Sequence, residues 1–346
     1  MTNKTNPYTL SFGKLPPQIV SRYYEIENII SAFNSTPASN QVFLLTGVRG
    51  SGKTVMMTSI AHKIKQDTDW IVVNLSPEYD LLESLAAELG EKKELKKIFK
   101  IERLSVSLAG IKIDVSGSSP ITDAKIAVTK MLNIVKKKNK KVLITIDEVY
   151  NNESLKKFAS VFQIFLREEL PIYLIMTGLY DNIRSLQNEK SLTFLYRASR
   201  IEMSPLSLRS IADNYKKTFS LDTESAKEMS AITGGYPYAF QLLGYLTWIA
   251  AGNYNSVIEE YRRYLEDYVY EKIYMEMSER DRFIALGIAR SETGNVDEIK
   301  KILDIKQNEW NPYRKRLIDK GIILVPERGH VRFTLPYFSD FILDNG

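Results

Sequence analysis

The chain has 346 residues, 44% of them hydrophobic, which supplies enough apolar surface for two or three domains with real cores. It contains no cysteine and two histidines, so disulfides and thiolate chemistry are excluded and a histidine-built metal centre is disfavoured. Its formal charge of +5 is too weak a bias to argue for a polyanionic partner. No window of about 18 uncharged apolar residues occurs and the chain start does not form a signal peptide, so we expect a soluble cytoplasmic protein with no membrane partner.

Short apolar runs rich in β-branched residues recur along the amino-terminal part of the chain, with helix-period segments between them. The runs are QVFLLT (41–46), WIVVNL (70–75), VLITI (142–146) and IYLIMT (172–177), followed by a shorter candidate, SRIEMS (199–204). Near-continuous apolar strands that alternate with helices predict an α/β domain, residues 1–204, with a parallel sheet covered on both faces.

The interval between the second and third runs carries two further features. LSVSLAGIKIDVSGSS (104–119) alternates about a central Ala-Gly and predicts an inserted β-hairpin, either an outward projection or an edge decoration without a role. The densest basic runs are EKKELKKIFKIER (91–103) and VKKKNKK (135–141). The second precedes a strand, which is typical of a solvated helix end whose lysines face the carbonyl dipole.

After Pro205 the strand patterns give way to helical periodicity, which predicts a helical domain over residues 205–275. From Ser278 onward the pattern is three helices, the third ending in a glycine C-cap, and then an alternating hairpin with Arg-Gly at its tip. That order predicts a winged helix-turn-helix over residues 276–346.

The segment GVRGSGKT matches G-x-x-x-x-G-K-[ST] and has the context that this pattern requires, a buried strand before it and a helix after it. Its glycines let backbone N–H groups turn toward phosphate oxygens, at the positive end of the helix dipole. We expect Lys53 to reach the β- and γ-phosphates and Thr54 to ligate Mg²⁺. The sequence thus predicts an ATP site built from Gly47, Val48, Arg49, Gly50, Ser51, Gly52, Lys53 and Thr54.

Hydrolysis also needs a held metal ion and a group that orients water. VLITIDEVY ends a strand with adjacent carboxylates, where Asp147 is expected to hold Mg²⁺ and Glu148 to orient or deprotonate the water; the alternative is an acidic surface turn. If the next strand lies beside this one, Thr177 falls where it can touch the γ-phosphate or the water, or else it caps the following turn.

Arginines follow in FLYRASRIEMSPLS. Arg197 or Arg200 could complete the site of a neighbouring subunit as an arginine finger, which stabilises the transition state by about 10³–10⁵ in rate. The alternative is an ordinary surface arginine in each case.

Several segments spread over most of the chain carry a family resemblance: PPQIVSRYYEIENI, GVRGSGKT, LITIDE, LIMTGL, LYRASRIEMSPLS and TGGYPYAFQLLG. Together they resemble the AAA+ and STAND-related ATPases, most closely the archaeal-type ATP-binding proteins, which join an ASCE P-loop domain to a helical lid and a winged helix. Origin-recognition initiators share this plan. The resemblance implies a sheet order of 5-1-4-3-2 and an adenine cradle in PQIVSRYYEI, with Ile19, Val20 and Arg22 near the base and phosphates. Packing of the entry helix is the alternative for Ile19 and Val20.

In the lid, Gly235-Tyr236-Pro237 looks like the G-x-P turn of STAND-type lids, in which the proline contacts bound nucleotide. Many AAA+ proteins place a sensor arginine on the next helix, but here that helix reads YAFQLLGYLTW and has no basic residue. This departure favours a slow switch over a fast motor.

The predicted winged helix has 12 basic and 12 acidic residues and is neutral overall. Its third helix and wing nevertheless concentrate residues that suit phosphate or base contact: Asn308, Asn311, Arg314, Lys315, Arg316, Lys320 and Arg328. Protein binding, autoinhibition and packing on the ATPase domain are the alternatives.

Two functions are therefore open. The first is a slowly ATP-hydrolysing, AAA+-like switch that assembles on double-stranded DNA. The second is a STAND-like signalling or scaffold ATPase with little turnover, whose winged helix binds protein. A phosphotransferase is disfavoured because Asp147 and Glu148 suit water activation, and a helicase because no further helicase motif occurs.

Overall fold

The computed structural model describes residues 5–11, 15–108, 111–113, 119–189 and 192–346. The chain falls into two compact units. We call the first the helical unit, made of Met1–Arg22, Gly47–Val55 and Glu202–Gly346, and the second the sheet unit, made of Tyr23–Thr46 and Met56–Ile201. The phosphate loop thus belongs to the helical unit.

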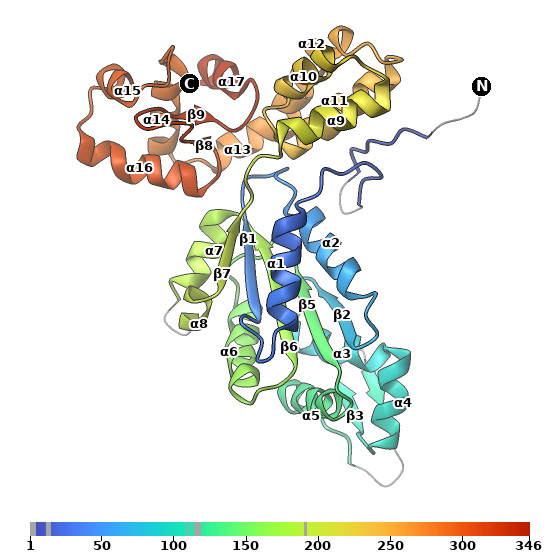
Figure 1. Cartoon of the computed structure of the whole chain (residues 1–346). Helices are drawn as coiled ribbons and strands as arrows, with labels where there is room; N and C mark the ends of the chain where they lie inside the picture. Colours follow the sequence, from blue (N-terminus) through green and yellow to red (C-terminus); the bar gives the residue numbers. More distant parts are fainter. Residues whose placement is uncertain (1–4, 12–14, 109–110, 114–118, 190–191) are drawn as a thin grey trace. The chain divides into compact units, whose positions relative to one another are not determined.

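The sheet unit is built on a five-stranded sheet of order β2-β5-β6-β1-β7 (Figure 1). Numbered among themselves along the chain, the five strands have the order 5-1-4-3-2, so the predicted α/β fold and strand order are confirmed. The pairs β1–β6, β2–β5 and β5–β6 are parallel. The strands are β1 (Val42–Thr46), β2 (Trp70–Leu75), β5 (Lys141–Ile146), β6 (Ile172–Gly178) and β7 (Ser199–Glu202).

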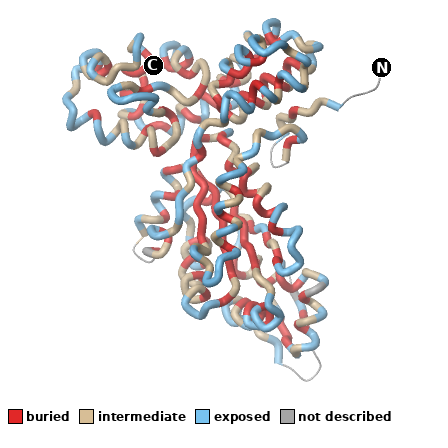
Figure 2. Tube along the Cα trace, viewed as in Figure 1, coloured by how far each residue is buried: buried red, intermediate tan, exposed pale blue. Residues whose placement is uncertain are grey.

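These segments are apolar in sequence because the strands they form are buried. Every residue of β1 and of β6 is buried, because helices cover the sheet (Figure 2). The helices in this part of the chain are α1 (Tyr23–Asn34), α2 (Lys53–Ile64), α3 (Leu81–Glu91), α4 (Lys93–Ile101), α5 (Ala124–Lys137), α6 (Glu153–Arg167), α7 (Tyr180–Gln187) and α8 (Thr193–Tyr196).

A small antiparallel pair, β3 (Val106–Leu108) and β4 (Ile111–Ile113), lies between α4 and α5 in the chain, where the sequence predicts a hairpin. Val106 pairs with Ile113, and both side chains are buried in the core of the sheet unit. Residues 109–110 and 114–118 of the predicted segment lie outside the described residues.

Helices make up most of the helical unit. Its first part comprises α9 (Leu208–Phe219), α10 (Thr223–Ile232), α11 (Pro237–Ile249), the 3₁₀ turn η2 (Asn255–Val257), α12 (Ile258–Leu265), the π-helical turn η3 (Glu266–Tyr270) and α13 (Glu271–Glu276).

The amino-terminal segment is anchored on these helices. The ring of Tyr8 is buried, its hydroxyl donates to Asn214 Oδ1 at 2.7 Å, and burial raises its pKa to about 12. A Cβ on Gly244 would lie 2.6 Å from that ring, so α11 needs glycine at this point.

The carboxyl-terminal part has the element order predicted for a winged helix. It contains α14 (Glu279–Arg290), α15 (Val296–Leu303), α16 (Gln307–Asp319), the antiparallel pair β8 (Ile323–Leu324) and β9 (Arg332–Phe333), and a final helix, α17 (Phe338–Asn345), that the sequence analysis missed. The helix α16 ends at Asp319 with Lys320 as its C-cap, and the predicted glycine follows at Gly321, whose φ of 78° lies in the left-handed region.

The residues on either side of position 276 share one hydrophobic core. Tyr270 in η3 packs against Phe338 and Phe341 of α17, with ring centroids 5.0 and 5.8 Å apart. The division into residues 1–204, 205–275 and 276–346 stays a prediction. None of the helices in the described residues has the length and apolar character needed to cross a membrane.

Candidate active site

The phosphate loop joins β1 to α2 and depends on glycine backbone geometry. Gly50 and Gly52 have φ values of 70° and 88°, in the left-handed region that favours glycine. At Gly50 a Cβ would lie 2.2 Å from the Tyr236 hydroxyl, so a side chain there would displace the lid. The pattern of glycines in the motif is therefore required by both the turn and its close packing.

Lys53, the first residue of α2, is buried and held inside the loop. Its Nζ donates to the carbonyl oxygens of Gly47 and Val48, at 3.0 and 2.9 Å, which fixes the ammonium group beside the loop before any ligand binds. Ser51 Oγ is buried with no hydrogen-bond partner among the described residues. A phosphate group would satisfy this hydroxyl, and the amino-terminal end of α2 favours negative charge, so the loop fits a nucleoside triphosphate.

The Gly235-Tyr236-Pro237 turn and the start of α11, which we call the lid, pack directly on the phosphate loop. The Tyr236 hydroxyl donates to the carbonyl oxygen of Arg49, and the Tyr238 amide donates to that of Gly50 at 3.2 Å. Burial raises the pKa of Tyr236 well above its usual value, so the hydroxyl stays a neutral donor. Pro237 lies over Gly52, where a Cβ would be 3.7 Å from the proline ring. The predicted nucleotide contact of Pro237 is therefore compatible with its place beside the loop.

The acidic pair follows β5 in the sheet unit. Thr177, at the end of the neighbouring strand β6, is fully buried; its hydroxyl donates to Asp147 Oδ1 and accepts the Glu148 amide at 3.1 Å. Glu148 has a φ of 51°, an unusual value for a bulky residue, and its side chain is exposed. The threonine thus orients one carboxylate and holds the turn that presents the other, and such backbone strain is typical of functional sites.

We expect Thr177→Val to lower ATP turnover about tenfold, because it removes a hydrogen bond that positions Asp147 while keeping the volume of the side chain. Thr177→Ser keeps the hydroxyl and should restore most of the activity. Turnover measured against Mg²⁺ concentration tests this, and equal turnover in the valine variant and the native protein would refute the positioning role.

The amino-terminal segment that the resemblance places at the adenine is bound to the helical unit. Arg22 donates to the backbone oxygen of Ser204 and to its hydroxyl, the latter at 3.4 Å. Val20 packs on the core of that unit, whereas Ile19 is 41% exposed. The adenine contact of these residues stays a prediction.

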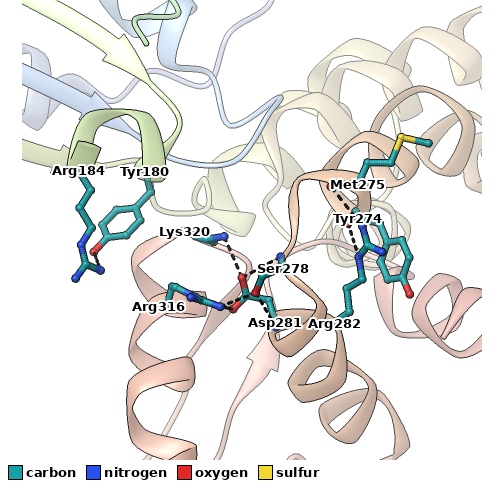
Figure 3. Close-up of polar contacts among 9 residues, drawn as sticks. All are labelled: Tyr180, Arg184, Tyr274, Met275, Ser278, Asp281, Arg282, Arg316 and Lys320. Atoms are coloured by element: carbon teal, nitrogen blue, oxygen red, sulfur yellow. Dashed lines mark hydrogen bonds and ion pairs between the residues drawn. The ribbon is translucent and has the colours of Figure 1, made fainter. Parts of the chain in front are cut away.

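The two arginine-finger candidates have different surroundings. Arg197 follows α8 and is exposed, with no ion pair to any described residue. Arg200 lies over the ring of Tyr180, 5.2 Å from its centroid, and the Tyr180 hydroxyl accepts a hydrogen bond from Arg184 at 3.2 Å (Figure 3). Arg197 is thus the freer of the two for a contact in trans.

Three of the predicted nucleic-acid residues, on α16 and directly after it, are bound by carboxylates. Lys315 pairs with Asp319 at 2.9 Å, and Arg316 and Lys320 both bind Asp281 of α14. Among the described residues, Arg314 and Arg328 have no ion pair, and the Asn311 side chain accepts from Gln307 at 2.7 Å.

Asp281 is the centre of a buried ionic cluster (Figure 3). Its side chain is fully buried, accepts from Arg316 Nε at 2.7 Å and from Lys320 Nζ at 3.1 Å, and forms a capping box with Ser278 at the start of α14. Burial acts to raise the pKa of Asp281, but the Arg316 hydrogen bond and the Lys320 charge outweigh it and leave the pKa below its ordinary value.

A further ion pair, which sequence reasoning missed, links the phosphate loop to α13. Arg49 donates through Nε and Nη2 to Glu276 Oε1, at 2.9 and 2.7 Å. Arg282 of α14 in turn donates to the backbone oxygens of Tyr274 and Met275 at the end of α13 (Figure 3). No local pattern marks Glu276, because its partner lies 227 positions away in the chain.

Two family models match the chain. Residues 19–243, well over half of its length, match the model described as an ATPase domain predominantly from Archaea. Residues 267–342 match a domain of unknown function (DUF8462). No curated protein matches.

Solved structures show the same fold. The Walker-type ATPase of Pyrococcus abyssi is 15% identical with a TM-score of 0.64, over 94% of this chain and 96% of that one. Cdc6p of Pyrobaculum aerophilum is 13% identical with a TM-score of 0.50, over 97% of each chain.

Proposed function

Because the chain belongs to the family of ATPase domains found predominantly in Archaea, we propose that it is a slow ATP-dependent switch whose winged helix contacts duplex DNA. Family membership makes the chain an ATPase. The residue roles, the slow turnover and the DNA contact are what we propose beyond that membership.

The roles follow from the chemistry of the two motifs. Lys53 binds the β- and γ-phosphates from its place inside the loop, and Glu148 orients the attacking water. Thr54 and Asp147 would hold Mg²⁺, which when bound neutralises charge on the phosphates. Turnover is slow because α11, which follows the Gly235-Tyr236-Pro237 turn, carries no arginine to sense the γ-phosphate.

One observation supports the proposal of a switch: a continuous series of polar contacts within the helical unit joins the phosphate loop to α16. It runs from Arg49 to Glu276 at the end of α13, from that helix end to Arg282 of α14, and from Asp281 of α14 to Arg316 and Lys320. A phosphate that draws Arg49 away from Glu276 would release the first of these contacts. Nucleotide state would then change how firmly the winged helix is held.

The same module offers groups for DNA. Arg314 and Arg328 have no ion pair among the described residues, and guanidinium groups suit phosphate oxygens. Lys315, Arg316 and Lys320 would reach phosphates only by exchanging their carboxylate partners. We therefore assign the phosphate contact chiefly to Arg314 and Arg328, with Asn311 toward the bases.

Glu276→Gln tests the coupling. In the native protein we expect the affinity for a labelled DNA duplex to differ about 5- to 50-fold between ADP and a non-hydrolysable ATP analogue, and in Glu276→Gln we expect the two affinities to converge. Fluorescence anisotropy over a salt series measures both the affinity and the phosphate contacts.

Glu309→Gln is the matched control, because it removes another surface ion pair of the same unit, Arg280–Glu309 at 3.1 Å. The control should keep the nucleotide dependence. A Glu276→Gln protein that also keeps it would refute the coupling, and duplex binding that does not weaken with salt would refute the DNA contact.

The neutral charge of residues 276–346 and the carboxylate-bound lysines and arginines on α16 favour a second candidate, a STAND-like scaffold whose winged helix binds protein. This candidate predicts nucleotide binding with negligible turnover and no duplex binding at low salt in either nucleotide state. The same anisotropy series separates the two functions.

A further inference from the structure

The positive charge of the chain is concentrated in residues 91–141. This stretch has 14 basic and 5 acidic residues, a net charge of +9, whereas the whole chain has +5, so the remaining residues together carry −4. All of the stretch belongs to the sheet unit, and none of it belongs to the nucleotide motifs or to the winged helix.

The structure brings the two basic runs of this stretch together. The helices α4 and α5 pack against each other, and Glu102, directly after α4, pairs with Lys138 at 3.4 Å and Lys137 at 4.0 Å at the end of α5. We call the exposed lysines in the second half of α4 and at the end of α5 the lysine pole: Lys97, Lys100, Lys136, Lys137 and Lys138.

Helix dipoles do not account for this charge. Lys100 lies in the last turn of α4, and Lys136 and Lys137 lie in the last turn of α5. Each helix end carries roughly half a negative charge, so the two ends and Glu102 offset about two of the five positive charges. Among the described residues, Lys97, Lys100 and Lys136 have no carboxylate partner.

The neighbouring lysines serve the fold instead. Lys140 Nζ donates to the backbone oxygen of Thr68 at 2.6 Å, and Lys141 lies over the ring of Trp70, 5.0 Å from its centroid. The run VKKKNKK therefore divides into three exposed lysines that belong to the lysine pole and two that pack on the sheet unit.

We propose that the lysine pole is a second polyanion-binding surface, which takes the phosphate backbone of a nucleic-acid duplex without reading its sequence. Lysines are depleted in protein–protein interfaces, whereas interfaces with nucleic acid are strongly positive. The proposal goes beyond the winged-helix contact, because the two surfaces share no residue.

Two further observations select a duplex over other polyanions. Of the apolar residues of α4, Leu95 and Phe99 are fully buried and Ile98 is partly buried. Ile101 is the one apolar residue of this helix that is largely exposed, so α4 presents no continuous apolar face to a lipid surface. Phe99 is also the only aromatic residue in the stretch 91–141, so no exposed ring is available on which unpaired bases could stack.

The test neutralises three of the lysines without disturbing an ion pair, in the triple variant K97Q/K100Q/K136Q. The matched control, K65Q/K217Q/K272Q, removes three exposed lysines elsewhere that also have no carboxylate partner among the described residues. Both variants should keep native circular dichroism and native ATP turnover. A 30-base-pair DNA duplex, an RNA duplex of the same sequence, single-stranded DNA and vesicles of anionic phospholipid serve as probes.

We expect the pole variant to bind both duplexes at least tenfold more weakly than the control at about 50 mM salt, and to lower the slope of log affinity against log salt by about 0.9 for each lost contact. A loss confined to one duplex would show which nucleic acid the lysine pole takes and would still support it. Equal duplex binding by the two variants, or a loss confined to vesicles or to single strands, would overturn the proposal.

An Arg314→Ala/Arg328→Ala variant separates this proposal from the winged-helix contact. If that variant binds DNA normally and the pole variant does not, the winged-helix contact fails and the lysine pole stands. If the winged-helix variant loses DNA binding and the pole variant keeps it, the winged-helix contact stands and the lysine pole fails.

Discussion

Replacement of Glu148 by glutamine is expected to lower ATP turnover by about 10²–10⁴-fold, because the amide cannot take a proton from the attacking water. Nucleotide binding should persist, since the phosphate loop lies on a separate segment and Lys53 keeps its hydrogen bonds to Gly47 and Val48. The turn should also persist, because it is held through the Glu148 amide by Thr177 and not through the side chain.

Phosphate release under single-turnover conditions measures the loss, and binding of a fluorescent ATP analogue measures the retained affinity. Glu153→Gln is the control, because Glu153 is a highly exposed carboxylate at the start of α6, only five positions further along the chain. Turnover at the native rate in Glu148→Gln would refute the role of Glu148 as the base. Equal losses of turnover in Glu148→Gln and Glu153→Gln would indicate a general effect of charge.

The second large effect is on stability. We expect Asp281→Asn to lower the free energy of unfolding by about 3 kcal/mol, because it removes the buried negative charge that binds both Arg316 and the largely buried Lys320. Asparagine keeps nearly the same shape and an oxygen for the cap of α14, so the loss reports on the charge. Urea unfolding followed by circular dichroism measures it.

Glu309→Gln again serves as the comparison, because the Arg280–Glu309 pair is exposed and such pairs contribute about 0–1 kcal/mol. If both substitutions lower the free energy of unfolding by the same amount, the buried cluster contributes no more to stability than an exposed ion pair does.

The same cluster predicts a pH dependence. The pKa of Asp281 is lower in the folded protein than its ordinary value of about 3.9, so its contribution is complete above that value and is lost as the pH falls through the folded pKa. The difference in stability between the native protein and Asp281→Asn should therefore shrink below about pH 4 and stay constant from pH 5 to 8. A difference that grows on acidification would contradict the assignment.

Local features of the chain were predictable. The run VFLL is apolar because β1 is buried along its whole length. The segment GVRGSGKT forms the predicted loop between β1 and α2 because the left-handed geometry at Gly50 and Gly52 favours glycine. The carboxylates after β5 are beside the end of β6 because those strands pair in parallel, which the sheet order implied by the resemblance requires.

Other features could not be predicted from the sequence. The helix α17 was missed, although Phe338 and Phe341 close the core around Tyr270. The shared core of the helical unit also crosses the position at which sequence patterns place a domain boundary. Periodicity reports that a face is apolar but does not report which other face covers it.

The charged residues show most clearly which features the sequence alone determines and which depend on the tertiary structure. Residue type and spacing along the chain established the phosphate loop, the acidic pair and the basic character of both α16 and the stretch 91–141, because these depend on neighbours within a few residues. The folded chain established how those charges are used. It places Arg316 and Lys320 on Asp281, 35 and 39 positions away, and leaves Lys97, Lys100 and Lys136 without a carboxylate partner in the part of the sheet unit that is described. An ion pair depends on distances through space, and only packing brings together side chains that lie so far apart in sequence.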